Sequence, residues 1–469
     1  MKTTIMTVRN LCVLLTFAVG SFFVSCRKAD VINTGGSTPS TGTNQTLSPE
    51  ALRDSTIAYS KDFYLWYNQI PSSFGQQYSE PDLMMEDLHR YSVEPGFSGP
   101  VDKWSFGIKK AEWDNMTAGM SSTNNTNSNG DFGISIFFRS EGDLRVRLVE
   151  PNSPAAAAHI QRGWKIASIN GGGTNISTSN ADNIVDKVYY SSNTSFTFVK
   201  PDGTSVDITL NAAHYTQQPV YMDEVYTVNG RSVGYLVFNS FLGDTNRIYS
   251  DFQRVFSKFA SAGISELIVD LRYNGGGYVS VQEKLADYLA PYSANGGLMF
   301  KETYNDKHSN MNSSAYFHKL GSLNLSKVYF IVTKSTASAS ELLINNLKPY
   351  MDVRLVGPSS THGKPVGFFP VPVGDWYIFP VSFKSTNKNG EGNYFGGIPV
   401  NYSAQDGLDH DWGQGESCLS AVLNGIGNGT MSRMGGAPVI TESSEVLRSN
   451  RKLDVPAFKG MLNGKRNAE

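Results

Sequence analysis

Residues 327–347 read KVYFIVTKSTASASELLINNL and place a strand directly before a helix. The apolar run Lys327–Thr333 is typical of a buried strand, and Ala339–Tyr350 has helical apolar spacing. Ser338 therefore falls where the strand ends and the helix begins. The free N–H groups of a first helical turn and the positive end of the helix dipole point toward such a residue. Because the same N–H groups can hold an oxyanion, Ser338 is a candidate nucleophile at the junction of a strand and a helix.

A second interpretation of the same residues involves no chemistry. Ser338 and Glu341 have the S-x-x-E spacing of a capping box, in which the serine hydroxyl accepts a hydrogen bond from the first helical turn. The two interpretations are compatible, and this segment alone favours the capping role.

Strands and helices alternate on both sides of this stretch. Apolar strands are expected at 233–238, 266–271 and 353–356, and amphipathic helices at 247–262 and 279–289. Alternation of this kind predicts an α/β domain, which we place at residues 220–425.

Lys364 is the predicted partner of Ser338. A 12-residue helix is about 18 Å long, and the strand after it runs back about 17 Å, so the next loop returns to the level of Ser338. A lysine that loses water there would have a lowered pKa and could take the serine proton. A solvated loop lysine is the plain alternative, and His362 in the same loop is a second candidate base.

The stretch Asp270-Leu-Arg-Tyr-Asn-Gly-Gly-Gly277 predicts a strand that runs into a glycine turn. Glycine permits positive φ and close approach of the backbone to a substrate. The N–H of Gly276 is therefore a candidate oxyanion donor, and an ordinary tight turn is the alternative.

Together these segments resemble the C-terminal processing, or tail-specific, serine proteases of peptidase family S41. The resemblance rests on the order of Asp270–Gly277, Thr336–Glu341 and His362–Pro365, and covers roughly residues 48–424. It implies a crotonase-like sheet with helices, with Ser338 as nucleophile and Lys364 as general base. It also implies an oxyanion hole formed by the backbone N–H groups of Gly276 and Ala339. Phe368 stands where many members have a glutamine that orients the lysine, which leaves Thr361, Ser360 or a water for that task.

Residues 127–212 predict a compact β-rich module. Phe132-Gly133-Ile134 at the start of the expected strand 132–138, the turn 149–155 and the strand 166–171 resemble a PDZ domain. The resemblance implies a groove near Asp131–Ser135 that binds peptide C-termini by adding a strand, with Phe132, Gly133 and Ile134 as binding residues. A packing module of the same shape without a ligand is the alternative.

The N-terminal residues predict export. A basic start and the apolar run 11–24 describe a signal peptide over residues 1–26. Phe23-Val-Ser-Cys26 resembles a lipobox, in which Cys26 would carry lipid; ordinary cleavage nearby is the alternative. Residues 27–47 are Ser-, Thr- and Gly-rich and predict a flexible linker. Residues 48–125 are expected to form a helical domain, and 426–469 a polar tail.

Composition excludes several classes of function. The chain of 469 residues has 40 Lys and Arg against 42 Asp and Glu, so a general nucleic-acid binder is not expected. Its 3 cysteines and 7 histidines show no zinc spacing, so neither a metal nor a cofactor is predicted.

These observations predict an α/β multidomain protein: a helical part, a PDZ-like part and a catalytic part. The predicted function is that of an exported Ser/Lys-dyad endopeptidase, lipid-anchored in the cell envelope, that cleaves polypeptides recruited through their C-termini. A catalytically inert peptide-binding lipoprotein and an envelope scaffold of the same fold are the alternatives.

Overall fold

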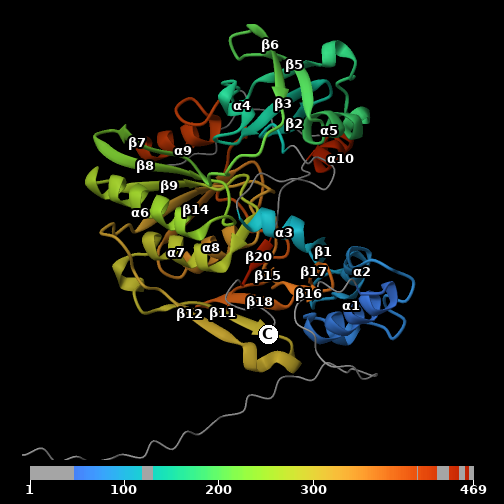
Figure 1. Cartoon of the computed structure of the whole chain (residues 1–469). Helices are drawn as coiled ribbons and strands as arrows, with labels where there is room; N and C mark the ends of the chain where they lie inside the picture. The colour runs from blue at the N-terminus through green and yellow to red at the C-terminus, as the bar shows by residue number, and fades with distance from the viewer. Residues whose placement is uncertain (1–46, 119–129, 409, 430–442, 454–459, 464–469) are drawn as a thin grey trace, which may run out of the picture. The chain divides into compact units, whose positions relative to one another are not determined.

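The computed structural model describes residues 47–118, 130–408, 410–429, 443–453 and 460–463 (Figure 1). The expected signal segment, Cys26 and most of the linker lie outside these residues. Among the described residues, no helix is both long enough and apolar enough to cross a membrane.

A six-stranded sheet forms the centre of the α/β part. Its order is β19 (Tyr402–Ser403), β14 (Asp352–Gly357), β13 (Lys327–Ile331), β9 (Glu266–Asp270), β8 (Arg231–Phe238) and β7 (Val220–Val228). All neighbouring pairs are parallel except β7 with β8. The carboxyl ends of β9 and β13 therefore meet at one edge, where the predicted glycine turn and Ser338 follow them.

Helices cover both faces of this sheet (Figure 1). Three of them, α6 (Thr245–Ser261), α7 (Val279–Leu289) and α8 (Ala339–Leu347), pack into the core on one face, and α9 (Ser417–Asn428) packs on the other. Alternate residues of the strands supply the two cores because successive side chains of a strand point to opposite faces: Leu236, Val269 and Phe330 on one side, Tyr235, Ile268 and Ile331 on the other. The predicted mixed α/β fold is confirmed.

The N-terminal part is not a separate helical body. Helices α1 (Pro49–Phe63) and α2 (Pro81–Leu88) bury side chains in the same hydrophobic core as the central sheet. The strand β1 (Phe106–Lys109) pairs with β17 (Trp376–Phe379), which in turn pairs with β16 (Val371–Val373). Sequence periodicity shows a helix but not which core it joins, so this sharing of a core could not be predicted.

Four strands form a further sheet. Its order is β12 (Ser313–Tyr316), β11 (Leu298–Tyr304), β18 (Phe383–Asn387) and β15 (Val366–Gly367).

Residues 130–213, here called the five-stranded unit, have a core of their own. The unit is an antiparallel sheet in the order β2 (Ile134–Ser140), β3 (Asp143–Val149), β4 (Lys165–Ile169), β5 (Asn193–Val199) and β6 (Ser205–Asn211). Helix α5 (Ala181–Tyr189) buries Ile184, Val185 and Val188 against it. Strand β2 lies at the edge of the sheet.

The prediction that residues 426–469 form a polar tail without structure is wrong. This range begins inside α9 and contains helix α10 (Ser444–Leu453) and strand β20 (Gly460–Leu462). Val446 and Leu453 are buried in the core of the five-stranded unit, and Met461 and Leu462 in the main core. Each segment is short and supplies few apolar residues, so no periodic pattern shows in the sequence.

Candidate active site

Ser338 lies between β13 and α8, as the sequence predicted, and its backbone is unusual. It has φ +59° and ψ −108°, in the half of the map that glycine favours. The side chain is fully buried. Such conformations persist only where the surrounding structure imposes them, and they cluster at functional sites.

The hydroxyl of Ser338 faces the first turn of α8 in the arrangement of a capping box but makes no hydrogen bond of ordinary geometry to it. Its Oγ is buried and has no hydrogen-bond partner among the described residues, whereas the amide of Ser338 donates to Glu341 Oε2 at 2.8 Å. Ser338 and Glu341 thus occupy capping-box positions, but only the Glu341 half is a hydrogen bond. A buried hydroxyl without a partner costs free energy, and a substrate or a proton acceptor would supply the missing contact.

Glu341 joins the Ser338 turn to the Lys364 loop. The oxygen that accepts from the Ser338 amide also accepts from the Lys364 amide at 2.8 Å, so one atom holds both backbones. The other carboxylate oxygen accepts from the Gly363 amide and from the Thr361 hydroxyl, each at 2.6 Å. Burial raises the pKa of Glu341, although these hydrogen bonds oppose the rise. This bracing holds Ser338 and Lys364 in fixed relation.

Lys364 is fully buried in an aromatic cradle. Its Nζ lies 3.8 Å from the centre of the Phe368 ring and 5.6 Å from that of Trp104. Burial lowers the pKa of Lys364 well below its usual value, and the charges of Asp102 and Glu341 only partly oppose this. A lysine with a lowered pKa can be neutral near physiological pH and accept a proton.

The other candidates for the chemistry or for orienting the lysine are engaged elsewhere. The Thr361 hydroxyl donates to Glu341 and accepts from the Ile398 amide, and Ser360 accepts from Lys334. His362 receives the Trp104 indole N–H at Nε2, and its Nδ1 lies 3.1 Å from the Lys334 carbonyl oxygen. Phe368, at the position of the usual glutamine, contacts the lysine itself through its ring.

The glycine turn lies against the start of α8. A Cβ at Gly276 would lie 3.0 Å from the Ala339 amide nitrogen and would collide with the carbonyl oxygen of Gly460. Gly276 has φ +106°, which only glycine adopts readily. The carbonyl oxygen of Asn274 accepts from the Ala337 amide and from the Ser340 hydroxyl, each at 3.0 Å, which fixes the turn to the serine segment.

The two predicted oxyanion donors differ in their present contacts. The Ala339 N–H has no hydrogen-bond partner among the described residues, as an oxyanion donor requires. The Gly276 N–H donates to Asn274 Oδ1 at 2.9 Å, so it reaches an oxyanion only if it shares or leaves that contact.

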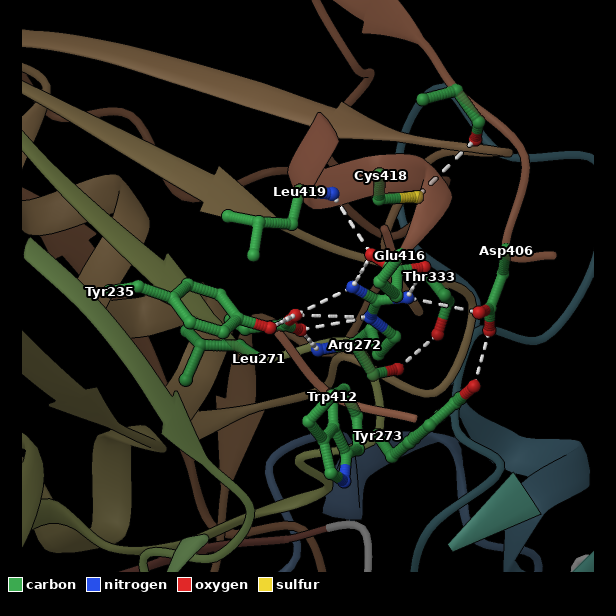
Figure 2. A network of polar contacts seen from close by, with 12 residues as sticks. Tyr235, Leu271, Arg272, Tyr273, Thr333, Asp406, Trp412, Glu416, Cys418 and Leu419 are labelled. Atoms are coloured by element: carbon green, nitrogen blue, oxygen red, sulfur yellow. Dashed lines mark hydrogen bonds and ion pairs between the residues drawn. The ribbon is translucent and has the colours of Figure 1, made fainter. Parts of the chain in front are cut away.

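A buried ionic network fixes the other side of this turn (Figure 2). Arg272 Nη2 lies 2.6 Å from Asp270 Oδ2, and Nη1 lies 2.6 Å from Glu416 Oε1 and 3.0 Å from Asp406 Oδ1. Burial raises the pKa of Glu416, but the Arg272 charge outweighs this and lowers it to about 2.

The network continues into the five-stranded unit. Asp406 accepts a hydrogen bond from the Tyr273 hydroxyl (Figure 2), and it also pairs with Arg162. The guanidinium of Arg162 lies 4.8 Å from the Trp412 ring centre and donates to the His410 carbonyl at 2.6 Å. A residue of the five-stranded unit is thus tied through Asp406 to the strand end that carries the glycine turn.

The predicted peptide-binding residues Phe132, Gly133 and Ile134 line a pocket that extends to the glycine turn. Tyr273, Gly275 and Ser335 line the same pocket from the α/β part. The structure therefore places these residues on a pocket that the glycine turn and Ser335, three positions before Ser338, also line.

Sequence reasoning missed several residues of the site. Asp102 and Trp104 reach Lys364 from the N-terminal part, and Asp406 and Glu416 hold Arg272 from segments in which the sequence predicted no helix or strand. These residues lie more than 100 positions from their partners, and no local pattern marks them. The one available signal was Arg272 itself, because an arginine at the end of a buried strand requires acidic partners.

Comparison with known proteins identifies the domain that carries this site. Residues 232–399 match the model of peptidase family S41. This range contains Asp270–Gly277, Ser338 and Lys364, the segments on which the predicted resemblance rests. The chain therefore contains a peptidase family S41 domain, and the expected family is confirmed.

Individual relatives point the same way. The carboxy-terminal processing protease CtpB of Bacillus subtilis is 29% identical over 242 residues, which are 50% of this chain and 47% of the relative. A CtpA-like serine protease of Staphylococcus saprophyticus is 26% identical over 255 residues, 54% of this chain and 48% of the relative. The chain thus spans about half the length of these curated relatives.

A solved structure covers more of the chain. A crystal structure from Bacteroides fragilis assigned to the S41 proteases has a TM-score of 0.64 and 25% identity, and the match covers 80% of this chain and 97% of that one.

Proposed function

We propose that the protein is a serine endopeptidase of the C-terminal processing type, with Ser338 as nucleophile and Lys364 as general base. One observation carries the proposal: a single Glu341 oxygen braces the backbones of Ser338 and Lys364, beside a buried serine hydroxyl without a hydrogen-bond partner among the described residues. The lowered pKa of Lys364 and the family of the domain support the same assignment.

The reaction follows from this arrangement. Neutral Lys364 Nζ takes the proton of Ser338 Oγ, which attacks the carbonyl carbon of a peptide bond. The Ala339 N–H, with Gly276 as second donor, holds the negative charge on the carbonyl oxygen. The C–N bond then breaks, the lysine gives its proton to the leaving amine, and water releases the acyl group from Ser338. No step requires a metal or a cofactor.

Two further features belong to the proposal. The edge strand β2 and the residues Phe132–Ile134 recruit polypeptide substrates by their C-termini.

A lipid on Cys26 holds the enzyme on a membrane of the cell envelope. Cys26→Ala should therefore move the protein from the membrane pellet to the soluble fraction. An unchanged partition would reject the anchor.

Cleavage of casein or a tagged peptide tests the catalytic assignment. Ser338→Ala and Lys364→Ala should each lose turnover while remaining folded, since an unactivated hydroxyl is a weak nucleophile. Matched controls are Ser359→Ala and Lys348→Ala, which change a half-buried serine and an exposed lysine outside the proposed dyad and should keep turnover. Activity near wild type in either dyad variant would refute the dyad. Peptide binding without turnover in the wild type would support the inert binding protein instead.

A further inference from the structure

Helix α10 lies against the five-stranded unit beside β2 and α5 (Figure 1). Its Val446 and Leu453 are buried in the core of that unit, while Leu447 on the same helix is 47% exposed. The contact therefore rests on one face of the helix. This face covers the edge strand of the sheet, which is the strand that an extended peptide would join.

The polar contacts of α10 occupy the outward-facing backbone groups of β2. Asn450 Oδ1 accepts from the Phe138 amide at 2.8 Å, and Asn450 Nδ2 donates to the Phe138 carbonyl at 2.9 Å. Two residues along, the Ile136 amide donates to the Tyr189 hydroxyl at 3.1 Å, and that hydroxyl donates to the Leu453 carbonyl at 3.0 Å. The side-chain amide of Asn450 thus makes the same pair of hydrogen bonds to Phe138 that the backbone of an added strand would make.

Helix α10 also contacts the segment 178–182. Ser449 Oγ donates to the Thr178 carbonyl at 2.8 Å, and Lys452 Nζ pairs with Asp182 Oδ2 at 2.6 Å, the latter on α5. Helix α10 thus bridges β2 and the segment 178–182. A peptide strand cannot pair with β2 along Ile136–Phe138 while these contacts hold, because the backbone groups at Phe138 are already bonded.

Beyond α10, strand β20 contacts the glycine turn. Gly460 donates its N–H to the Gly275 carbonyl at 3.1 Å, and β20 runs parallel to β10 (Gly276–Tyr278). With Met461 and Leu462 buried in the main core, β20 anchors the far end of the segment. An anchored segment has a high effective concentration at its own binding site, on the order of millimolar for short tethers.

We propose that residues 443–453 are an intramolecular ligand of the β2–α5 groove, which keeps it closed to peptide C-termini until α10 is displaced. The inference deepens the proposed function, on which its effect on proteolysis rests. A peptide that joins β2 must replace Asn450 at Phe138, so occupancy by substrate and by α10 exclude each other.

The test uses this chain's own segment as probe. A fluorescein-labelled peptide of residues 443–453 is titrated against the full chain carrying Ser338→Ala, which prevents cleavage, and its anisotropy is measured. Adding Asn450→Ala removes two hydrogen bonds from the resident helix, so the probe should bind about tenfold more tightly. Arg448→Ala changes an exposed residue of the same helix and should bind like the parent.

A second variant covers the case in which Asn450→Ala does not fold. Lys452→Glu places a negative charge against Asp182 and should also raise probe affinity, by a smaller factor. Equal probe affinity in the parent and in every folded variant, including no binding at all, would overturn the proposal.

A proteolysis arm separates the inference from the proposed function. In the chain with Ser338 intact, Asn450→Ala should raise kcat/KM for a peptide with a free carboxylate several-fold over the Arg448→Ala control. If the probe binds as expected and no chain cleaves any peptide, the proposed function fails and the groove assignment stands. If the chains cleave peptides and Asn450→Ala changes neither probe affinity nor kcat/KM, the inference fails alone.

Discussion

At Ser338 the backbone values of φ +59° and ψ −108° are those of a residue that a turn would normally supply as glycine. A side chain in such a region costs on the order of 1–3 kcal/mol, which the surrounding contacts must offset. Glu341 and Asn274 supply these contacts to the serine segment. The cost is consistent with a hydroxyl that is held at one place for chemistry.

Substitution of Ser338 separates this strained geometry from helix capping. If the strain dominates, Ser338→Gly should be more stable than Ser338→Ala by about 1 kcal/mol, after the greater chain entropy of glycine is deducted. If the hydroxyl caps the helix, both variants should lose about 0.5–2 kcal/mol and Gly should hold no advantage of that size. Urea unfolding of the two variants and the wild type makes the comparison.

The lowered pKa of Lys364 predicts the pH dependence of cleavage. Burial favours the neutral amine, and the neutral amine is the base, so kcat/KM should rise with pH and level off well below 10.5. Between the lowered pKa and 10.5 the folded state binds fewer protons than the unfolded state, so the stability contributed by this group falls as pH drops from 10.5 toward the lowered pKa and levels off below it. A rate that keeps rising to pH 10.5, or that falls over this range, would contradict the assignment of the base.

At the scale of elements, the turn after β9 is held from two sides. Asn274 fixes it to the start of α8, and Arg272 fixes it to Asp406 and Glu416 near α9. The sequence predicted the strand, the turn and the helix because each has a local pattern. It could not predict what holds them, because Asp406 and Glu416 lie more than 100 positions from Arg272 in segments without periodicity.

Substitution of Glu416 tests how much the ionic network around Arg272 contributes to stability. Glu416→Ala leaves Arg272 buried with fewer carboxylates and should cost about 3–5 kcal/mol of unfolding free energy. Asp375→Ala removes an exposed carboxylate that pairs with Lys109 and should cost no more than about 1 kcal/mol. Chemical denaturation of both variants gives the values, and equal small losses would show that the network contributes little to stability.

At the scale of the whole molecule, distant segments complete the site. Lys364 is surrounded by residues from two distant segments: Asp102 and Trp104 from the N-terminal part, and Phe368 directly after β15. Gly460 contacts the glycine turn from the C-terminal part. Motifs in the sequence predicted Ser338, Lys364 and the turn as parts of one site. The cradle around the lysine and the position of α10 depend on tertiary packing, which no local pattern reports.

Acylation of Ser338 tests the central claim most directly. The protein is mixed with an activated peptide ester, the reaction is quenched within one turnover, and the adduct is located by intact mass and peptide mapping. The account predicts one acyl group per chain on Ser338, none in Ser338→Ala, and a greatly slowed adduct in Lys364→Ala, because the hydroxyl needs its base. An adduct on another residue, such as Ser340, or an undiminished adduct in Ser338→Ala would contradict it.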